Sequence, residues 1–393
     1  MTLRDREILN PGPTPDPIRA AKPRHPAGWE PGVAWDGTAG TLTTAPLDGP
    51  PSSWDDLLAV WDLDPAVYEV IEPVQYRAWD GPITGGEVQR MFYYRATIRT
   101  RRAPGDTIPE LLNMIRRHRR KPAAHTDGHP FVLMAGDIQA GKPDGDGTAG
   151  TIDRFLTGTD LALEEYRSSL KRGRCGSTVY LPWLGDCVEG NESQGGANVA
   201  RNDTTVTEAV RIIRHLMLHQ IKTFAPHAER IIVPVVPGNH DEPHRIAGKM
   251  ASRYDDSWAI ESASAVAMAV GENPHLGHVS FVFPQRDELT ITLDIGGTIT
   301  ALAHGHQFGR DVDKWWANQA HGRQPVGDAT VLLAGHLHHY VHRDTGSKTF
   351  IQIPAVDGGS TWFRHRYGAN APSGLAWAVI GGGTVHDHGR IAL

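Results

Sequence analysis

The chain has 393 residues, more than one hydrophobic core usually supports, so we expect one large domain and a smaller one. Its net charge of −6 argues against an overall basic protein that coats nucleic acid. The start lacks the apolar core of a signal peptide, and no later stretch approaches the roughly 20 apolar residues that span a bilayer. Only two cysteines occur, which excludes a disulfide framework and favours a reducing compartment. We therefore expect a soluble cytoplasmic protein.

The beginning of the chain divides into two parts. Residues 1–50 are rich in proline, glycine and alanine and show no helical or alternating periodicity, so we expect an extended arm. At Ser53 a capping residue precedes apolar residues at helical spacing, which predicts a short helix. Two β-rich runs begin at Tyr68 and Val88, with a Gly/Pro-rich stretch between them that suits a hairpin. Residues 51–105 are therefore predicted to form a small α+β module.

Residues 106–129 are predicted to be a basic helical linker. After Pro109 an apolar stripe at helical spacing ends in a cluster of basic residues at 116–121. This cluster suits contact with phosphate groups. It also suits a solvated helix end, where cations are favoured by the helix dipole.

From residue 130 onward, apolar strands alternate with helical stretches such as 205–221 and 255–270. This alternation is typical of layered α/β domains. Residues 130–393 are therefore predicted to form the α/β catalytic domain.

Five strands of this domain each run into a residue of a metal-ligating type. The strand ends carry Asp137, Asp186, Asn239, His304, and the pair His336 and His338. In open α/β sheets ligands bind at the carboxyl ends of the strands. Glycine precedes Asp137, Asp186, Asn239 and His336, and it allows sharp turns and close backbone approach. We therefore expect a preorganised group of oxygen and nitrogen ligands.

The motifs Asp-x-Gln, Gly-Asp-x-x-Glu, Gly-Asn-His-Asp, His-Gly-His and Gly-His-x-His follow one another over roughly residues 130–360. In this order, each at a strand end, they resemble the motifs of the calcineurin-like metallophosphoesterases. The resemblance implies an α/β fold with a four-layer α-β-β-α sandwich, to which the small N-terminal α+β module is added. It also implies two divalent metal ions and hydrolysis of a phosphoester by attack of a metal-bridging hydroxide.

The resemblance assigns the ligands to two sites. Asp186 would bridge both metal ions. The first ion would be completed by Asp137, Gln139 and His338, and the second by Asn239, His304 and His336. His306 is an alternative ligand to His304, and we favour His304 because it directly follows the strand.

The resemblance also assigns catalytic roles. His240 would contact the scissile phosphate and protonate the leaving oxygen, and Asp241 would orient the imidazole of His240. Glu189 occupies the usual acidic position of the family and would accept a hydrogen bond behind the ligands. Cys187, beside Asp186, is either a redox-sensitive thiol or a small packing side chain.

One ligand position departs from the family. Where the family usually has a histidine, this chain has Gln139, so a neutral amide oxygen replaces an imidazole. We expect weaker binding of the first ion and a preference for Mn²⁺, with Mg²⁺, Fe or Zn²⁺ as alternatives. A second interpretation is that Gln139 is a bystander and water fills the position.

Several residues are candidates for contact with the substrate, because arginine suits phosphate and tryptophan suits bases. They are Arg310, Arg323, Trp362, Arg364 and Arg366. Each is also compatible with an ordinary surface or packing role.

The motif Asp-x-Gln-x-Gly-Lys and the stretch Asp-Gly-Gly-Ser-Thr-Trp-Phe look similar to those of phosphoesterases from actinobacterial phages, which are similar to nuclease subunits of double-strand-break processing complexes. This implies a phosphodiester in nucleic acid as substrate, DNA-processing proteins as partners, and the host cytoplasm as location. The acidic net charge argues against it. Two alternatives stay open. One is a small-nucleotide or cyclic-nucleotide phosphodiesterase or phosphomonoesterase, and the other is a non-catalytic binding scaffold.

Overall fold

The computed structural model describes residues 28–35, 39–47, 49, 51–59, 61, 63–65, 67–82, 88–100, 123–192, 196, 199–246, 249–250, 252–309, 311–359, 364–365, 368 and 371–393. The chain divides into two compact units, Met1–Ala103 and Pro104–Leu393, and each is described by itself. The basic cluster at 116–121, with most of the linker predicted over 106–129, lies outside the described residues. No helix in the described part of the chain is long and apolar enough to cross a membrane.

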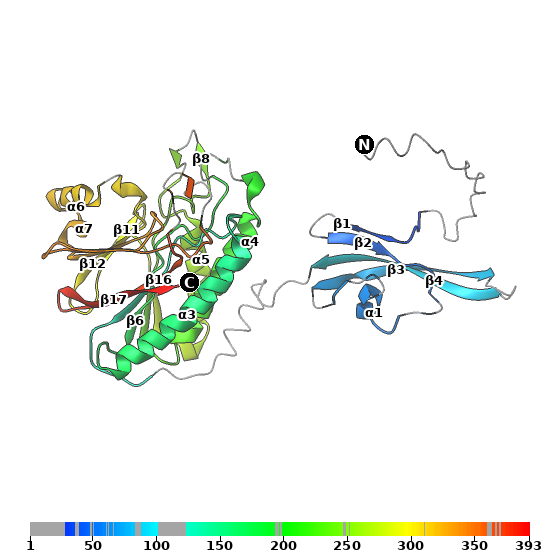
Figure 1. The fold of residues 1–393 in the computed structure, drawn as a ribbon, viewed down its shortest axis with the longest axis horizontal. Coiled ribbons are helices and arrows are strands. Elements are labelled where there is room, and N and C mark those ends of the chain that lie inside the picture. Colours follow the sequence, from blue (N-terminus) through cyan, green and yellow to red (C-terminus); the bar gives the residue numbers. More distant parts are fainter. Residues whose placement is uncertain are drawn as a thin grey trace, which may run out of the picture. The chain divides into compact units, whose positions relative to one another are not determined.

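The first unit is a four-stranded antiparallel sheet with one helix packed against it (Figure 1). The strands are β1 (Gly32–Trp35), β2 (Ala39–Thr43), β3 (Tyr68–Pro82) and β4 (Val88–Thr100), in the order β1-β2-β4-β3. Helix α1 (Trp54–Ala59) begins after Ser53, whose hydroxyl accepts a hydrogen bond from the Asp56 amide at 3.1 Å. The short helix and the two hairpin strands predicted for this part of the chain are therefore confirmed.

The extended arm predicted over residues 1–50 is wrong for residues 32–35 and 39–43, which form β1 and β2. Strand β2 pairs with β4, and its Leu42 is fully buried in the core beneath α1. The partner strand β4 lies far along the chain, and the sequence around β2 is rich in proline. The local sequence therefore did not predict this pairing. Residues 1–27 of the predicted arm lie outside the described residues.

The second unit contains two larger sheets. The first has the order β10-β7-β6-β5-β16-β17 and is parallel from β10 to β5. Its strands are β5 (Phe131–Met134), β6 (Thr178–Tyr180), β7 (Arg230–Pro234), β10 (Val279–Val282), β16 (Gly374–Gly381) and β17 (Thr384–Ala392). The second has the order β11-β12-β13-β15-β14. Its strands are β11 (Thr290–Asp294), β12 (Ile299–Ala303), β13 (Val331–Ala334), β14 (Val341–Asp344) and β15 (Thr349–Gln352).

Five helices belong to the described part of this unit. They are α3 (Gly147–Lys171), α4 (Val206–Phe224), α5 (Trp258–Gly271), α6 (Val312–His321) and α7 (Pro325–Asp328). Short elements are the turns η3 (Val199–Arg201), η4 (Pro274–Leu276) and η5 (His306–Phe308) and the hairpin β8 (Arg245–Ile246) with β9 (Lys249–Met250). Helix α4 starts with a capping box formed by Thr205 and Glu208. The predicted helices over 205–221 and 255–270, and the mixed α/β class, are confirmed.

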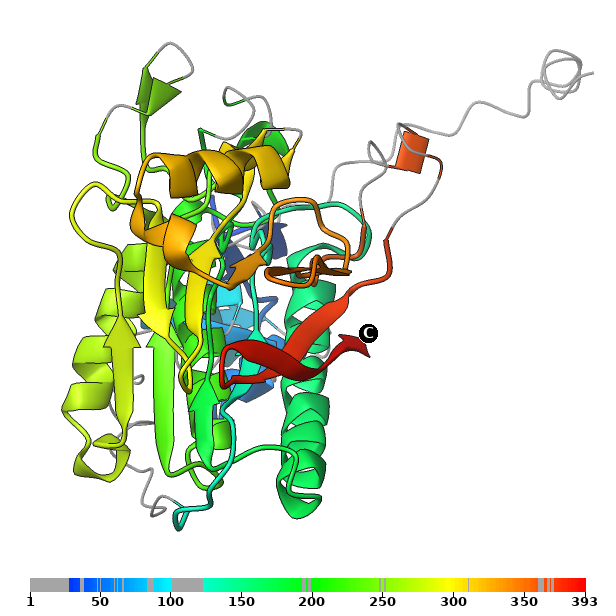
Figure 2. The same ribbon diagram turned by 90° about the vertical axis from the view of Figure 1, so that its left-hand side faces the viewer.

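Buried side chains of the second unit form three hydrophobic clusters. In β5, Phe131 and Leu133 pack with α3, α4 and α5, whereas Val132 and Met134 pack with strands of the second sheet. Successive side chains of a strand point to opposite faces, so this division places the first sheet between helices and the second sheet. A third cluster joins Trp316 of α6 to the strands β12, β13 and β15. Both sheets are therefore held rigidly, and Figure 2 shows the strands and α3 side by side.

Leu333 tests the packing between the two sheets, because it is fully buried in the cluster that joins them. We expect Leu333→Ala to lower the free energy of unfolding by about 2 to 5 kcal/mol, since the cavity is enclosed on both sides. The measurement is urea denaturation followed by tryptophan fluorescence. The control is Met268→Ala on α5, where the side chain is 74% exposed and the change should stay within about 0.5 kcal/mol. Equal losses for the two variants would contradict this packing.

Candidate metal centre

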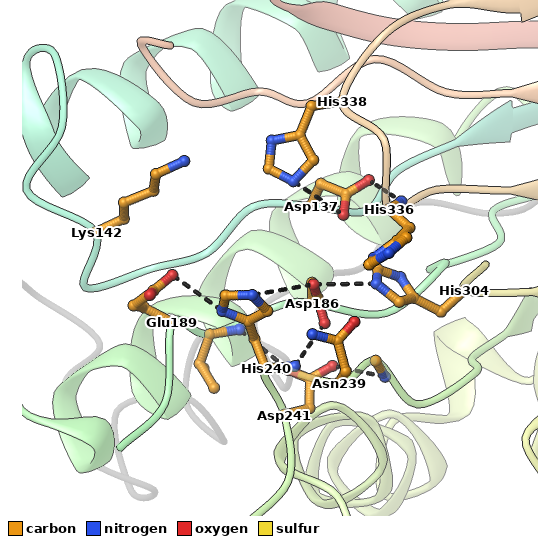
Figure 3. Close-up of polar contacts among 12 residues, drawn as sticks. Asp137, Lys142, Asp186, Glu189, Asn239, His240, Asp241, His304, His336 and His338 are labelled. Atoms are coloured by element: carbon orange, nitrogen blue, oxygen red, sulfur yellow. Dashed lines mark hydrogen bonds and ion pairs between the residues drawn. The ribbon is translucent and has the colours of Figure 1, made fainter. Parts of the chain in front are cut away.

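The seven predicted ligands converge at the carboxyl ends of five strands, and we call them the cage (Figure 3). They are Asp137 and Gln139 after β5, Asp186 after β6, Asn239 after β7, His304 after β12, and His336 and His338 after β13. Strands β5, β6 and β7 are parallel, and so are β12 and β13, so the chain leaves each group of strands at the same edge. The sheets therefore supply fixed points from which the ligands extend.

Glycines before the ligands allow the loops to approach closely. A Cβ atom on Gly238 would lie 2.1 Å from the amide nitrogen of Asp186, and one on Gly335 would lie 2.6 Å from Oδ2 of Asp137. Neither distance is compatible with a side chain. The glycine positions singled out in the sequence are thus places where two loops of the cage touch.

The cage holds its backbone in an unfavourable conformation. Among the described residues, seven that are not glycine have positive φ, and five of them belong to the cage. These five are Asp137, Gln139, Asp186, His336 and His338. The left-handed region costs roughly 1 to 2 kcal/mol for such residues and persists where the surrounding structure over-determines it. Concentration of this strain in the ligands indicates that the site was selected for geometry rather than stability.

Asp186 occupies the centre of the cage and is almost completely buried. Its Oδ1 accepts a hydrogen bond from the His240 amide at 2.8 Å, and its Oδ2 lies 3.0 Å from His304 Nε2. Burial acts to raise the pKa of Asp186, but the His304 and His240 rings outweigh it and hold this pKa below its usual range. Asp186 is therefore an ionised oxygen ligand.

His304 is fully buried and has its ring orientation fixed. Its Nδ1 donates a hydrogen bond to the Leu184 carbonyl oxygen at 2.7 Å, which directs Nε2 toward Asp186. Burial lowers the pKa of His304, but Asp186 outweighs it and raises this pKa to about 9. Asp186 therefore attracts a positive charge beside His304, and a metal ion can supply this charge in place of a proton.

Asp137 lies on the other side of the cage and is fully buried. Its Oδ2 accepts a hydrogen bond from the His336 amide at 2.8 Å, and its Oδ1 lies 3.5 Å from His338 Nε2. Burial raises the pKa of Asp137 above its ordinary value, although His338 and His304 act in the opposite direction. A nearby cation would stabilise the ionised form.

Three buried oxygen atoms of the cage have no hydrogen-bond partner in the described part of the chain. They are Asp137 Oδ1, Gln139 Oε1 and Asn239 Oδ1. Buried polar atoms are nearly always satisfied, so three such oxygens at one place fit a bound cation. In addition, ligand atoms of Asp186, His304 and His336 all lie within 4.8 Å of one another. This donor set, with carboxylate, amide and imidazole groups, fits a divalent metal.

His306, the alternative to His304, lies beside the cage. Its ring centre is 5.5 Å from that of His304 and 6.3 Å from that of His336. Burial and His304 lower the pKa values of both His306 and His336 to about 4, so both rings are neutral. The group of potential ligand atoms includes His304 and not His306, which favours His304 as the ligand.

His240 lies at the edge of the cage next to Glu189. Its Nδ1 is 3.1 Å from Glu189 Oε2, and its Nε2 is 3.9 Å from Asp186 Oδ2. Burial lowers the pKa of His240, but the two carboxylates outweigh it and raise this pKa to about 9. The ring can therefore carry a proton to the space in front of Asp186.

The role predicted for Asp241 is not supported, because its carboxylate is bonded to the backbone. Its Oδ1 accepts hydrogen bonds from the amides of Cys187 and Val188 at 2.9 and 3.1 Å, and its Oδ2 accepts one from Gly238 at 3.0 Å. Asp241 thus joins the loops after β6 and β7, and Glu189 takes the place beside the His240 ring. Cys187 is fully buried and burial raises the pKa of its thiol, so it packs rather than reacts.

Two further residues lie in motifs that the sequence singled out, but the sequence assigned no role to either. Lys142 and Asp357 form an ion pair, and Asp357 Oδ2 lies 3.7 Å from His338 Nδ1. Burial raises the pKa of Asp357, but His338 and Lys142 outweigh it and hold this pKa well below its usual range. Figure 3 shows Lys142 at the His338 side of the cage. Lys142 ends the Asp-x-Gln-x-Gly-Lys motif, and Asp357 begins the Asp-Gly-Gly-Ser-Thr-Trp-Phe stretch.

Of the predicted substrate contacts, Arg323 and Arg364 lie in described segments. Arg310, Trp362 and Arg366 lie outside the described residues. Arg323 is exposed in the turn between α6 and α7, and α7 leads into the start of β13, the end opposite to His336. Arg364 is exposed in a short described segment.

Comparison with known proteins gives a limited result. No protein-family model and no curated protein matches the chain. Among solved structures, a predicted phosphoesterase from Streptococcus pneumoniae has 14% identity and a TM-score of 0.28, covering 68% of this chain and 91% of its own. An archaeal phosphodiesterase has 12% identity and a TM-score of 0.31, with 67% and 99% covered. Zinc-bound Vps29 from Entamoeba histolytica has 18% identity and a TM-score of 0.31, with 67% and 98% covered. Because these identities and TM-scores are low, the function must be inferred from the site itself.

Asp241→Asn tests the role of this carboxylate in joining the two loops. The amide turns an acceptor atom into a donor that faces backbone N–H groups, so we expect a loss of about 1 to 3 kcal/mol in the free energy of unfolding of the metal-free protein. Urea denaturation measures it, with His240→Gln as the control, for which a smaller loss is expected. If Asp241→Asn is as stable as the wild type, the carboxylate does not hold the loops.

Proposed function

We propose that the chain is a metal-dependent phosphoesterase of the calcineurin-like type that hydrolyses a phosphodiester at a dinuclear metal centre. The observation that carries this proposal is the set of three buried oxygen atoms without partners, supplied by residues after β5 and β7 around the ionised Asp186. The order of the motifs along the chain supports the same family. The three hydrophobic clusters support the four-layer α-β-β-α arrangement that this family implies.

In this proposal Asp186 is shared by two ions. Asp137, Gln139 and His338 complete one site, and Asn239, His304 and His336 complete the other. The imidazole groups of the second site suit a transition metal, and the oxygen-rich first site favours manganese over zinc. Gln139 Oε1 is buried and unpartnered, which supports a ligand role rather than the bystander role.

Bound divalent cations would polarise the phosphoryl oxygens and lower the pKa of a water molecule at the site. The residues of the chain supply the remaining functions. His240, with Nδ1 held near Glu189, presents Nε2 toward the space in front of Asp186 and protonates the leaving oxygen. Burial of Asp137 and Asp186 limits access of bulk water to the ligand atoms.

For the substrate we propose a phosphodiester in nucleic acid, or in a nucleotide. The cage itself accepts any phosphoester, because its ligands contact only the phosphoryl group and the metals. A binding scaffold without catalysis is the less favoured candidate, since a His240–Glu189 pair beside the cage has no role in mere metal binding.

Metal titration tests the dinuclear site independently of catalysis. We expect isothermal titration calorimetry to show two Mn²⁺ ions per chain, and Asp186→Asn to weaken both by more than about 10-fold, because the shared charge is lost. Gln139→His should strengthen one of the two, since it restores an imidazole. Binding of a single ion by the wild type, unchanged in Asp186→Asn, would contradict the dinuclear centre.

Hydrolysis of bis-p-nitrophenyl phosphate tests the reaction. We expect Mn²⁺-dependent release of p-nitrophenolate, loss of it with EDTA, and loss of it in Asp186→Ala. A digestion panel of single-stranded DNA, duplex DNA, RNA, cyclic nucleotides and mononucleotides, with His240→Ala as the control, then identifies the substrate class. If only mononucleotides lose phosphate, the nucleic-acid proposal is wrong.

A further inference from the structure

A cavity next to the cage points to a part of the substrate that the cage does not contact. We propose that the pocket between η5 and α6 holds the nucleobase of a nucleoside phosphodiester whose phosphate is bound at the cage. This inference rests on the proposed function and names the substrate class of the same site. The pocket is lined by Phe308, Asp311, Lys314, Trp315 and Asn318.

The pocket has an aromatic wall of fixed geometry. Its volume is about 330 Å³. The ring centres of Phe308 and Trp315 are 4.5 Å apart with an angle of 45° between the planes. Phe308 also meets Phe350 edge to face at 6.3 Å, which anchors the pair on the second sheet. Both rings are half-buried, and both line the pocket. A planar base stacks well on such a wall.

Polar side chains lie on the rim of the same pocket. Asp311 caps α6, with its Oδ1 accepting a hydrogen bond from the Lys314 amide at 3.1 Å. The side-chain amide of Asn318 makes no hydrogen bond to any described residue and offers both a donor and an acceptor. The Lys314 ammonium adds a positive charge. A stacking wall with donors and acceptors at its edge matches a nucleobase better than an aliphatic or sugar group, which has no π face.

The chain places this pocket close to the cage. Turn η5 begins two residues after His304, and the Phe308 amide donates a hydrogen bond to the Gly305 carbonyl oxygen at 3.0 Å. A Cβ atom on Gly305 would lie 3.2 Å from the Cβ atom of His336 and 3.5 Å from Cε2 of Phe308, so the Phe308 ring lies close to the cage. Figures 1 and 2 both show α6 at the end of the unit that carries β8, the hairpin just after His240. A nucleoside attached to a phosphate at the cage is therefore within reach of the aromatic wall.

The test compares two phosphodiesters with the same leaving group. Thymidine 5′-(p-nitrophenyl) phosphate carries a base, and methyl p-nitrophenyl phosphate carries none. We expect the wild-type protein with Mn²⁺ to show a higher kcat/KM for the thymidine ester. In Trp315→Ala the ratio of kcat/KM for the thymidine ester to kcat/KM for the methyl ester should fall by roughly 5-fold to 150-fold, mainly through KM. This range corresponds to the stacking energy of one base.

Matched variants separate binding from folding. Trp315→Phe keeps an aromatic face and should retain most of the preference, whereas Met268→Ala, 74% exposed on α5, should leave it unchanged. Thermal unfolding of each variant identifies any loss of structure. If the wild type cleaves both esters with equal kcat/KM, or if Trp315→Ala keeps the wild-type ratio, the base pocket is refuted while the phosphoesterase proposal stands. If the wild type cleaves neither ester, the proposed function itself fails.

Competition experiments distinguish a nucleic-acid strand from a free nucleotide as the source of the base. Thymidine monophosphate and a single-stranded oligothymidylate are each added to the methyl ester assay, with wild type beside Trp315→Ala. Inhibition that is stronger for the oligonucleotide, and weakened in Trp315→Ala, assigns the pocket to a nucleic-acid strand. Stronger inhibition by the monophosphate, again weakened in the variant, assigns it to a free nucleotide. Inhibition that is identical in both proteins overturns the proposal.

Discussion

The burial of the ionised Asp186 is the constraint on which the rest of the second unit depends. A carboxylate at this depth is unfavourable unless charges and hydrogen bonds compensate it. The compensation comes from the His240 amide, from the His304 ring and from the position that a cation would take. These groups follow strands of both sheets, so the charge is stabilised only when the two sheets are packed together.

The cage is strained, and the cores around it hold the strain. Five ligand residues have left-handed backbones, and Gly238 and Gly335 touch atoms of other cage loops. Each such residue is unfavourable by itself. Strands β5 and β6 lie between the first two hydrophobic clusters, and β13 lies between the second and the third, so the loops cannot relax without disturbing the sheets. Rigid strands and strained loop ends together preorganise the ligands before a metal arrives.

Outside the cage, further side chains in loops and helices surround the site. Glu189 contacts His240, the Lys142–Asp357 pair lies beside His338, and Phe308 and Trp315 form the wall of a separate pocket. In the proposed function the cage holds the phosphoryl group through the metal ions, and the aromatic pocket holds the base attached to it. Such a division lets one fold serve many phosphoesters.

The sequence by itself determined the α/β class, the helices after Thr205 and near Trp258, and the ligand types at the strand ends, because periodicity and strand-end chemistry are local signals. It did not reveal β1 and β2, because β2 joins the sheet by pairing with β4 far along the chain, and it did not reveal that Asp241 accepts hydrogen bonds from backbone amides instead of His240. It also assigned no role to Lys142 and Asp357, which are brought together only in the folded protein. Tertiary structure decided these points, since contacts between residues far apart in sequence leave no local pattern.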